Sequence, residues 1–252
     1  MIQLKTPEQI KIMQIAGRIT GEALLVAKEM IKEGITTKQI DDKIRTYIKK
    51  CGAKPTFLGY GGFPGSACIS INDEVIHGIP SHDKILKNGD IVNIDVGAFY
   101  KGFTGDSAAT FAVGEISEAA QKLIDVTKES FFKGIEAIEK TPNPRLGDVG
   151  FAIASHARGN GFSVVEEYTG HGVGAELHED PNVPNYGTQG RGVRLYPGMT
   201  LAIEPMINEG TRHVRVLGDK WTVVTADGKL SAHYEHSIAI TENGVILLTK
   251  VD

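Results

Sequence analysis

Two aspartates, Asp95 and Asp106, lie on either side of a turn signal within segment 89–112. The β-branched run before the turn, the turn at Lys101 and Gly102, and the apolar return predict a β-hairpin. The aspartates are nearly equidistant from the turn, so we expect them almost opposite each other on neighbouring strands. Facing carboxylates repel, and a shared proton or cation relieves that repulsion. The alternative is a splayed turn that sends one aspartate to solvent.

Three further side chains could join these aspartates. Glu204 ends an apolar segment, and Glu235 lies within an expected strand, where acids are depleted. His171 lies in a loop whose glycines allow other backbone to approach it closely. The candidate set is Asp95, Asp106, His171, Glu204 and Glu235.

Four clustered carboxylates around a neutral imidazole favour divalent cations. Two such cations balance the four negative charges, and without them the repulsion would raise the carboxylate pKa values. Oxygen ligands with one imidazole suit Mn, Fe, Co or Zn. An acid-rich site that bridges two metals about 3.5–4 Å apart is a known arrangement for hydrolysis.

The composition narrows the class of protein. The chain has 252 residues, 41% of them hydrophobic, so it can bury a substantial core in one large or two small domains. The net charge of −4 argues against a dedicated nucleic-acid binder. Cys51 and Cys68 cannot form a disulfide scaffold, and no signal peptide or 18-residue apolar run occurs. We therefore expect a cytoplasmic protein without a membrane span.

Capping signals predict four helices. Thr6 and Gln9 match a capping box, Pro7 fits the first helical position, and Gly34 is the expected stop. Ser117 is the expected N-cap of the third helix. The helices are expected at about 7–33, 37–51, 118–140 and 145–159.

Short strands are expected between and after these helices. They fall at 67–71, 163–168, 221–225 and 230–240, beside the hairpin. Asp227-Gly228 is a hairpin signal that would pair 221–225 with 230–240. Asn243-Gly244 marks a further tight turn.

Segments 86–95 and 195–204 share the pattern Leu-x-x-Gly-x-x-aliphatic-x-Ile-acid. Each half also opens with two expected helices, so the order of elements repeats. We interpret this as an internal duplication with halves of roughly 1–115 and 116–252, in which Glu204 is the counterpart of Asp95. Two related halves packed face to face would bring these acids to a central cleft.

Two histidines outside the candidate set have open interpretations. His77 lies in a turn-rich segment, where a lone histidine is more often structural or solvated. His178 begins a segment that fails the H-E-x-x-H zinc pattern because Asn182 replaces the second histidine. His178 therefore fits a substrate contact better than a metal ligand. The aromatic and glycine-rich loop 57–65 is either a surface turn or a pocket wall.

Motifs spread over essentially the whole chain resemble those of the type I methionine aminopeptidases. The matching segments are 72–80 with His77, 93–96, 105–107, 170–174, 178–181, 203–206 and 234–236. The resemblance implies an α+β pita-bread fold in a single catalytic domain, 1–252. In that fold two pseudo-symmetric α/β halves share a central curved antiparallel sheet covered by helices.

The resemblance also implies the roles of the site residues. Asp95, Asp106, His171, Glu204 and Glu235 would be the metal ligands, with Asp106 and Glu235 bridging two ions. Glu204 would shuttle a proton, His178 would contact the scissile carbonyl, and His77 the scissile amide or leaving amine. The methionine pocket maps onto Phe57, Tyr60, Phe63, Cys68, Leu177 and Trp221.

The implied activity is metal-dependent removal of the N-terminal methionine from nascent proteins and peptides. A bridging water or hydroxide, activated by two divalent ions (Co, Mn, Fe or Zn), would attack the first peptide bond, with a small second residue favoured. The resemblance also implies possible contact with the ribosome. From the sequence we expect a monomer with neither membrane nor specific nucleic-acid partners. The alternatives are an Xaa-Pro aminopeptidase of the same fold and a non-catalytic pita-bread binding protein.

Overall fold

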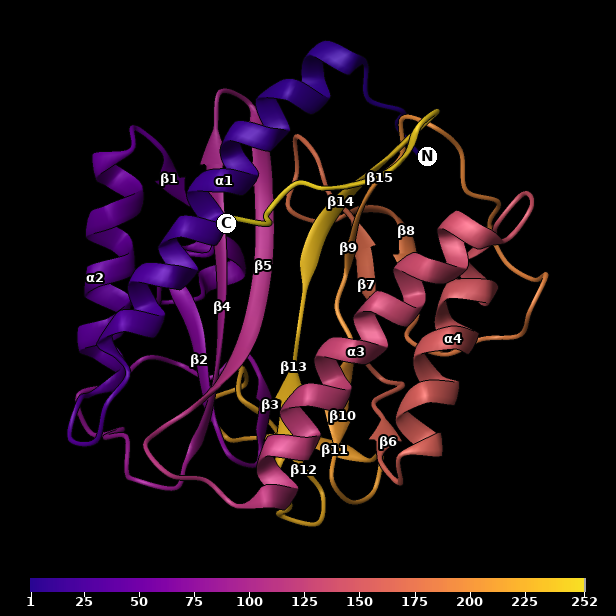
Figure 1. Ribbon diagram of the computed structural model, residues 1–252. Coiled ribbons are helices and arrows are strands. Elements are labelled where there is room, and N and C mark those ends of the chain that lie inside the picture. Colours follow the sequence, from indigo (N-terminus) through magenta and orange to yellow (C-terminus); the bar gives the residue numbers. More distant parts are fainter. Residues whose placement is uncertain (252) are drawn as a thin grey trace.

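Two groups of helices cover antiparallel strands in the computed structural model, which describes residues 1–251 (Figure 1). Helices α1 (Pro7–Met30) and α2 (Thr37–Lys50) lie over the strands of the N-terminal half. Helices α3 (Glu118–Lys140) and α4 (Leu146–Gly159) pack together at the right of Figure 1, whereas α2 lies at the left. Helix α3 contacts strands of the C-terminal half. The arrangement is α+β, as expected from the sequence.

The predicted caps define the helix starts. Thr6 Oγ1 accepts from the Gln9 amide and Gln9 Oε1 accepts from the Thr6 amide, which completes the capping box of α1. Ser117 caps α3 in the same way, through the amide of Ala120. Helix α1 ends at Met30, before the glycine expected to stop it.

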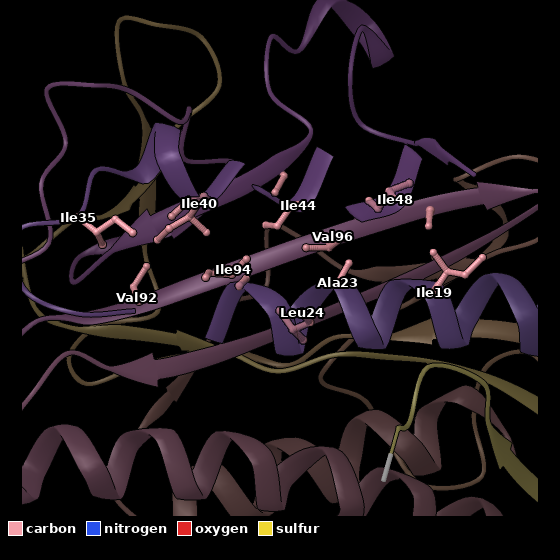
Figure 2. Packing of buried hydrophobic residues seen from close by; sticks show 14 of the residues in the cluster. Ile19, Ala23, Leu24, Ile35, Ile40, Ile44, Ile48, Val92, Ile94 and Val96 are labelled. Carbon is pink, nitrogen blue, oxygen red and sulfur yellow. The ribbon is translucent and has the colours of Figure 1, made fainter. Parts of the chain in front are cut away.

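The N-terminal core lies between α1, α2 and the first strands. Figure 2 shows Ile40, Ile44 and Ile48 of α2 gathered around Ile94 and Val96. All five side chains are fully buried. Each contributes about 1.5–3 kcal/mol relative to exposure, so this packing holds the strand that carries Asp95 in place.

The hairpin forms as predicted, but its register differs. Strands β4 (Ile91–Tyr100) and β5 (Phe103–Ala112) are joined by a two-residue turn in which Lys101 and Gly102 both have positive φ. Asp95 pairs with Ala108, and Asp106 pairs with Gly97. The aspartates are therefore diagonal neighbours two positions apart on one face, not opposite each other. Tyr100 and Phe103 close the ladder, which leaves Asp95 five and Asp106 three residues from the closing pair.

The remaining strands form four small sheets. β2 (Ala67–Ile71) and β1 (Lys54–Pro55) pair with β4, and β11 (Val214–Val216), β12 (Val223–Thr225) and β3 (Glu74–Ile76) form a second sheet. The third consists of β13 (Ser231–His233), β10 (Met206–Asn208) and β6 (Ser163–Val164). The fourth, in spatial order, is β15 (Gly244–Leu247), β14 (His236–Thr241), β9 (Thr200–Ile203), β7 (Gly170–Gly172) and β8 (Glu179–Val183).

Two strand predictions were wrong in detail. The segment 230–240 is interrupted at Tyr234 and Glu235, and it does not pair with 221–225. Instead β13 and β14 pair with β10 and β9, which are themselves separated by Glu204 and Pro205. Long-range pairing outcompeted the local turn signal. Strand β6 is also shorter than the predicted 163–168.

The two halves join along β5. The Glu235 amide donates to the Ala108 carbonyl at 2.8 Å, and the Ser237 hydroxyl bonds the backbone of Asp106 at 2.9 Å. Asp95, Ala108 and Glu235 therefore form one row across the joined strands.

Within residues 1–251, no helix combines the length and apolarity that a bilayer crossing requires.

Candidate metal centre

The five predicted ligands converge from three strands and from two breaks between strands. His171 Nε2 lies 3.6 Å from Asp106 Oδ2 and 3.5 Å from Glu204 Oε1. Donor atoms of Asp106, His171 and Glu235 all lie within 4.8 Å of one another. Burial first, and then the neighbouring carboxylate of Asp106, raises the pKa of Asp95 well above its usual range, which places these two side chains next to each other. The structure thus places all five side chains at the point where the halves meet.

Two strand breaks position the glutamates. Ile203 is the last residue of β9 and is paired with His236, the first residue of β14. Pro205 has no amide hydrogen, so the ladder cannot continue unchanged past Glu204, and the Pro205 carbonyl accepts from the Tyr234 amide at 3.2 Å. Both strands are thus irregular at the same level, where Glu204 and Glu235 line the cavity.

Glycines on both sides of His171 allow close strand packing. A Cβ at Gly170 would lie 2.3 Å from the Ala202 carbonyl oxygen, and one at Gly172 would lie 2.2 Å from that of Asp180. His171 Nδ1 donates to the Gly172 carbonyl oxygen at 2.8 Å. A neutral ring that carries its proton on Nδ1 presents the lone pair of Nε2 to the carboxylates, as a metal ligand requires.

A cavity of about 150 Å³ adjoins this cluster. Its walls include every residue that the sequence assigned to the ligands, the two further histidines and the pocket. The phenol of Tyr60 and His178 Nδ1 are 2.7 Å apart, and the edge-to-face rings of Phe63 and Trp221 are 5.2 Å apart. The lining residues are Phe57, Tyr60, Phe63, Cys68, His77, Asp95, Asp106, His171, Leu177, His178, Glu204, Trp221 and Glu235.

The chemistry of the donor set fits divalent cations. Burial first, and then neighbouring acid charges, raises the pKa values of Asp95, Glu204 and Glu235 well above their usual range. Among the described residues, Asp95 Oδ1, Asp106 Oδ1 and Glu235 Oε1 are buried without hydrogen-bond partners. Burial and the neighbouring His178 lower the pKa of His171 to about 4, so its imidazole is neutral. Cations would satisfy the orphaned oxygens and remove the repulsion.

The metal-free protein should therefore lose stability as pH rises above neutrality. The folded pKa values of these carboxylates exceed the unfolded ones, so the native state binds more protons above pH 4 and its stability falls through the folded pKa values. Each such group contributes up to about 1.4 kcal/mol per pH unit. Below the usual histidine pKa of about 6.5 the buried neutral rings of His77, His171 and His233 act in the opposite direction, because they bind fewer protons in the folded than in the unfolded state. Thermal unfolding in excess chelator should therefore show a falling midpoint above about pH 7, where the histidines are neutral in both states. With added divalent metal the fall should shrink, and a midpoint in chelator that rises above that pH would contradict the cluster.

Sequence reasoning assigned no role to His233, which the structure places behind Glu204. Its ring is 1% exposed, and its Nε2 lies 3.8 Å from Glu204 Oε2. Burial and the nearby His77 lower its pKa to about 3. The signal in the sequence was the two-residue spacing to Glu235, since alternate strand residues share a face.

A helix-covered antiparallel sheet with a buried carboxylate and imidazole centre defines the class of pita-bread metallopeptidases. The sequence pattern of metallopeptidase family M24 matches residues 11–242, and the chain belongs to this family. Its fold is the pita-bread fold.

Particular members of the family are highly similar to this chain. "Methionine aminopeptidase 1" of Bacillus subtilis (strain 168) is 52% identical over 251 residues, which cover 100% of both chains. The crystal structure of a methionine aminopeptidase from Thermotoga maritima has a TM-score of 0.97, at 49% identity and 100% coverage of both chains. The prolidase from Pyrococcus furiosus has a TM-score of 0.78 and 26% identity, with 99% of this chain but 66% of the prolidase covered.

Proposed function

We propose that this metallo-aminopeptidase removes the N-terminal methionine from peptides and proteins. The observation that carries the proposal is a small cavity whose lining combines the carboxylate and imidazole cluster with aromatic, thiol and aliphatic side chains. The terminal amine of a peptide can reach the acids while the side chain of its first residue occupies the apolar part of the cavity. The high identity to enzymes named methionine aminopeptidases over the full chain supports the same substrate.

The five ligands, Asp106 and Glu235 among them, would hold two divalent ions of Co, Mn, Fe or Zn. When bound, the ions supply Lewis acidity, which lowers the pKa of water and polarises the carbonyl that is attacked. Glu204 accepts the proton of the attacking water and delivers it to the leaving amine, which balances the hydrolysis.

Two histidines would orient the scissile bond. Burial lowers the pKa of His77 to about 4 and lowers that of His178, so both rings are neutral and can donate one N–H. The hydrogen bond between Tyr60 and His178 joins loops from the two halves at the cavity. His77 has φ 59°, a strained conformation that occurs at functional sites, and its ring meets the edge of Trp221.

The pocket walls suit a thioether. Phe57, Phe63, Cys68 and Leu177 are all buried and form one cluster. Burial and the nearby acids raise the pKa of the Cys68 thiol, so it stays neutral and apolar. Methionine adapts to such irregular apolar surroundings and gains favourable sulfur contacts with aromatic rings.

Removal of one aromatic wall should weaken substrate binding. Phe63 is 3% exposed, and its loss in Phe63→Ala would open space beside Trp221. We expect kcat/KM for a methionyl tripeptide to fall about 10- to 100-fold, mostly through KM, because about 2–3 kcal/mol of apolar contact is lost. Steady-state kinetics provide the measurement. Phe132→Ala, on the 40% exposed Phe132 of α3, is the control and should change little.

The Xaa-Pro alternative is not favoured. The methionine aminopeptidase 1 of Bacillus subtilis is 52% identical to this chain, whereas the prolidase from Pyrococcus furiosus is 26% identical. A non-catalytic role is disfavoured because all five candidate ligands are present and converge.

One substrate comparison tests the proposal. Protein loaded in parallel with Co, Mn, Fe or Zn is assayed on Met-Ala-Ser and on an Ala-Pro tripeptide. We expect release of methionine from the first and little cleavage of the second. Cleavage of only the Ala-Pro peptide would replace the proposal with the Xaa-Pro activity, and cleavage of neither would favour the binding-protein alternative.

We further propose that residues 1–252 act as one catalytic domain of two related halves. Each helix pair precedes a strand associated with a cavity acid: β4 carries Asp95 in its middle, and β9 ends directly before Glu204. Nascent chains in the cytoplasm are the proposed source of substrate, with the monomer as the working form.

A further inference from the structure

The row formed by Asp95, Ala108 and Glu235 carries two of the predicted ligands, and we call it the upper row. A second row of side chains lies next to it, two residues further along each strand. In the upper row Asp95 pairs with Ala108, which bonds Glu235. Two residues along each strand, Asn93 pairs with Thr110, whose hydroxyl oxygen bonds both backbone groups of His233 at 2.9 Å. Because the side-chain period of a strand is two, both rows present the same face.

The amide of Asn93 fixes the tautomer of His233. Asn93 Nδ2 lies 3.2 Å from the Val75 carbonyl oxygen, which can only accept, so this atom is the amide nitrogen. The same Nδ2 lies 3.2 Å from His233 Nδ1, and an amide nitrogen only donates. His233 Nδ1 must therefore accept, and the neutral ring carries its proton on Nε2.

That Nε2–H faces the catalytic glutamate. The Nε2 atom is buried and has no hydrogen-bond partner among residues 1–251, and Glu204 Oε2 lies 3.8 Å away. The terminal torsion of a glutamate is soft, so a small rotation of the carboxylate closes the gap. The other oxygen, Oε1, lies 3.5 Å from His171 Nε2, on the ligand side.

We propose that His233 is a positioning residue that donates Nε2–H to Glu204 Oε2 and thereby keeps Oε1 directed at the metal ligands. The Asn93 amide sets this donor, and Thr110 holds the backbone beneath it. Without the donor, the buried carboxylate could rotate, and both metal binding and proton transfer would lose their fixed geometry. Loss of such a supporting hydrogen bond typically costs 10- to 100-fold in metal affinity or activity.

The first experiment reads the tautomer directly. Nitrogen-15 NMR of ring-labelled histidine, with and without Zn, is recorded on the wild-type protein, and His233→Gln assigns the signal by its loss. We expect the Nε2–H tautomer in both states. An Nδ1–H tautomer would overturn the proposal. The measurement is made on the wild-type protein, and the only variant that must fold is His233→Gln, which assigns the signal.

The second experiment compares His233→Leu with His233→Gln. The amide nitrogen of glutamine is separated from Cβ by the same number of bonds as Nε2 of histidine, so glutamine can donate a hydrogen bond from a similar position. Only the leucine variant lacks the donor. We expect leucine to weaken metal affinity by calorimetry at least tenfold and to lower kcat about 10- to 100-fold with KM changed less than threefold. Glutamine should restore both to within about threefold. The donor role would be overturned if His233→Leu had the metal affinity and kcat of the wild-type protein. It would also be overturned if His233→Gln lost as much of both as His233→Leu.

The inference rests on the proposed function only in the assignment of Glu204 as a ligand and proton carrier. The tautomer and the metal affinity are measured without a peptide. If both are as expected while no methionyl peptide is cleaved, the substrate proposal fails and the positioning role stands.

Discussion

Asp106→Asn is expected to abolish most peptidase activity, lowering kcat by about 10³-fold or more. Asp106 is 4% exposed and lies within reach of Asp95, His171 and Glu235, so its carboxylate is central to the cluster of candidate ligands. The substitution keeps the size of the side chain and removes its charge. A loss of about 4 kcal/mol of transition-state stabilisation corresponds to that factor.

The measurements are kcat on Met-Ala-Ser and the metal content after dialysis against trace metal. We expect the variant to retain less bound metal than the wild-type protein. Because the repulsion with Asp95 is also removed, the metal-free variant should be at least as stable as the metal-free parent. Asp125→Asn, at an exposed position of α3, is the matched control. Full turnover by the Asp106 variant would exclude a dinuclear mechanism.

Metal removal should destabilise the protein, and the hairpin β4–β5 first. Its two aspartates lie on one face, with Asp106 buried and Asp95 half-buried, and β5 also carries the bond between Ala108 and Glu235 that joins the halves. Ligand binding at 100 times the Kd stabilises by about 2.7 kcal/mol, which in a chain of this length is about 5–10 °C in Tm. Chelation should therefore lower Tm by about that amount.

Hydrogen exchange locates the effect. After chelation, amides of residues 91–112 should lose protection before those of α3 and α4, because these helices carry none of the five candidate ligands. Restoring a divalent metal should recover the protection. Unchanged exchange in the hairpin after verified metal removal would contradict the assignment of Asp95 and Asp106 as ligands.

Local chemistry made the helices readable from the sequence. The capping box of Thr6 and Gln9 and the cap at Ser117 involve partners three residues away, so the helix starts needed no tertiary information. The two-residue turn at Lys101 and Gly102 was equally local. These signals gave the elements that carry Asp95 and Asp106.

Long-range pairing could not be read in the same way. Asp227-Gly228 suggested a hairpin, yet β13 and β14 pair with β10 and β9, which come from a segment on the other side of β11 and β12 in the chain. The break at Glu235 follows from the break beside Pro205 on the neighbouring strand, which no local pattern contains. His233 went unassigned for the same reason, since its partners Asn93 and Glu204 lie on other strands.

The sequence by itself determined which residue types could hold metal, the α+β class and the family resemblance. It placed both aspartates on one hairpin because a tight turn restricts where its strands can pair. Only the tertiary structure decided that they are diagonal neighbours, that Glu235 joins their face through Ala108, and that His233 stands behind Glu204. Those relations depend on strand register between distant segments, which is set by the packing of the whole sheet.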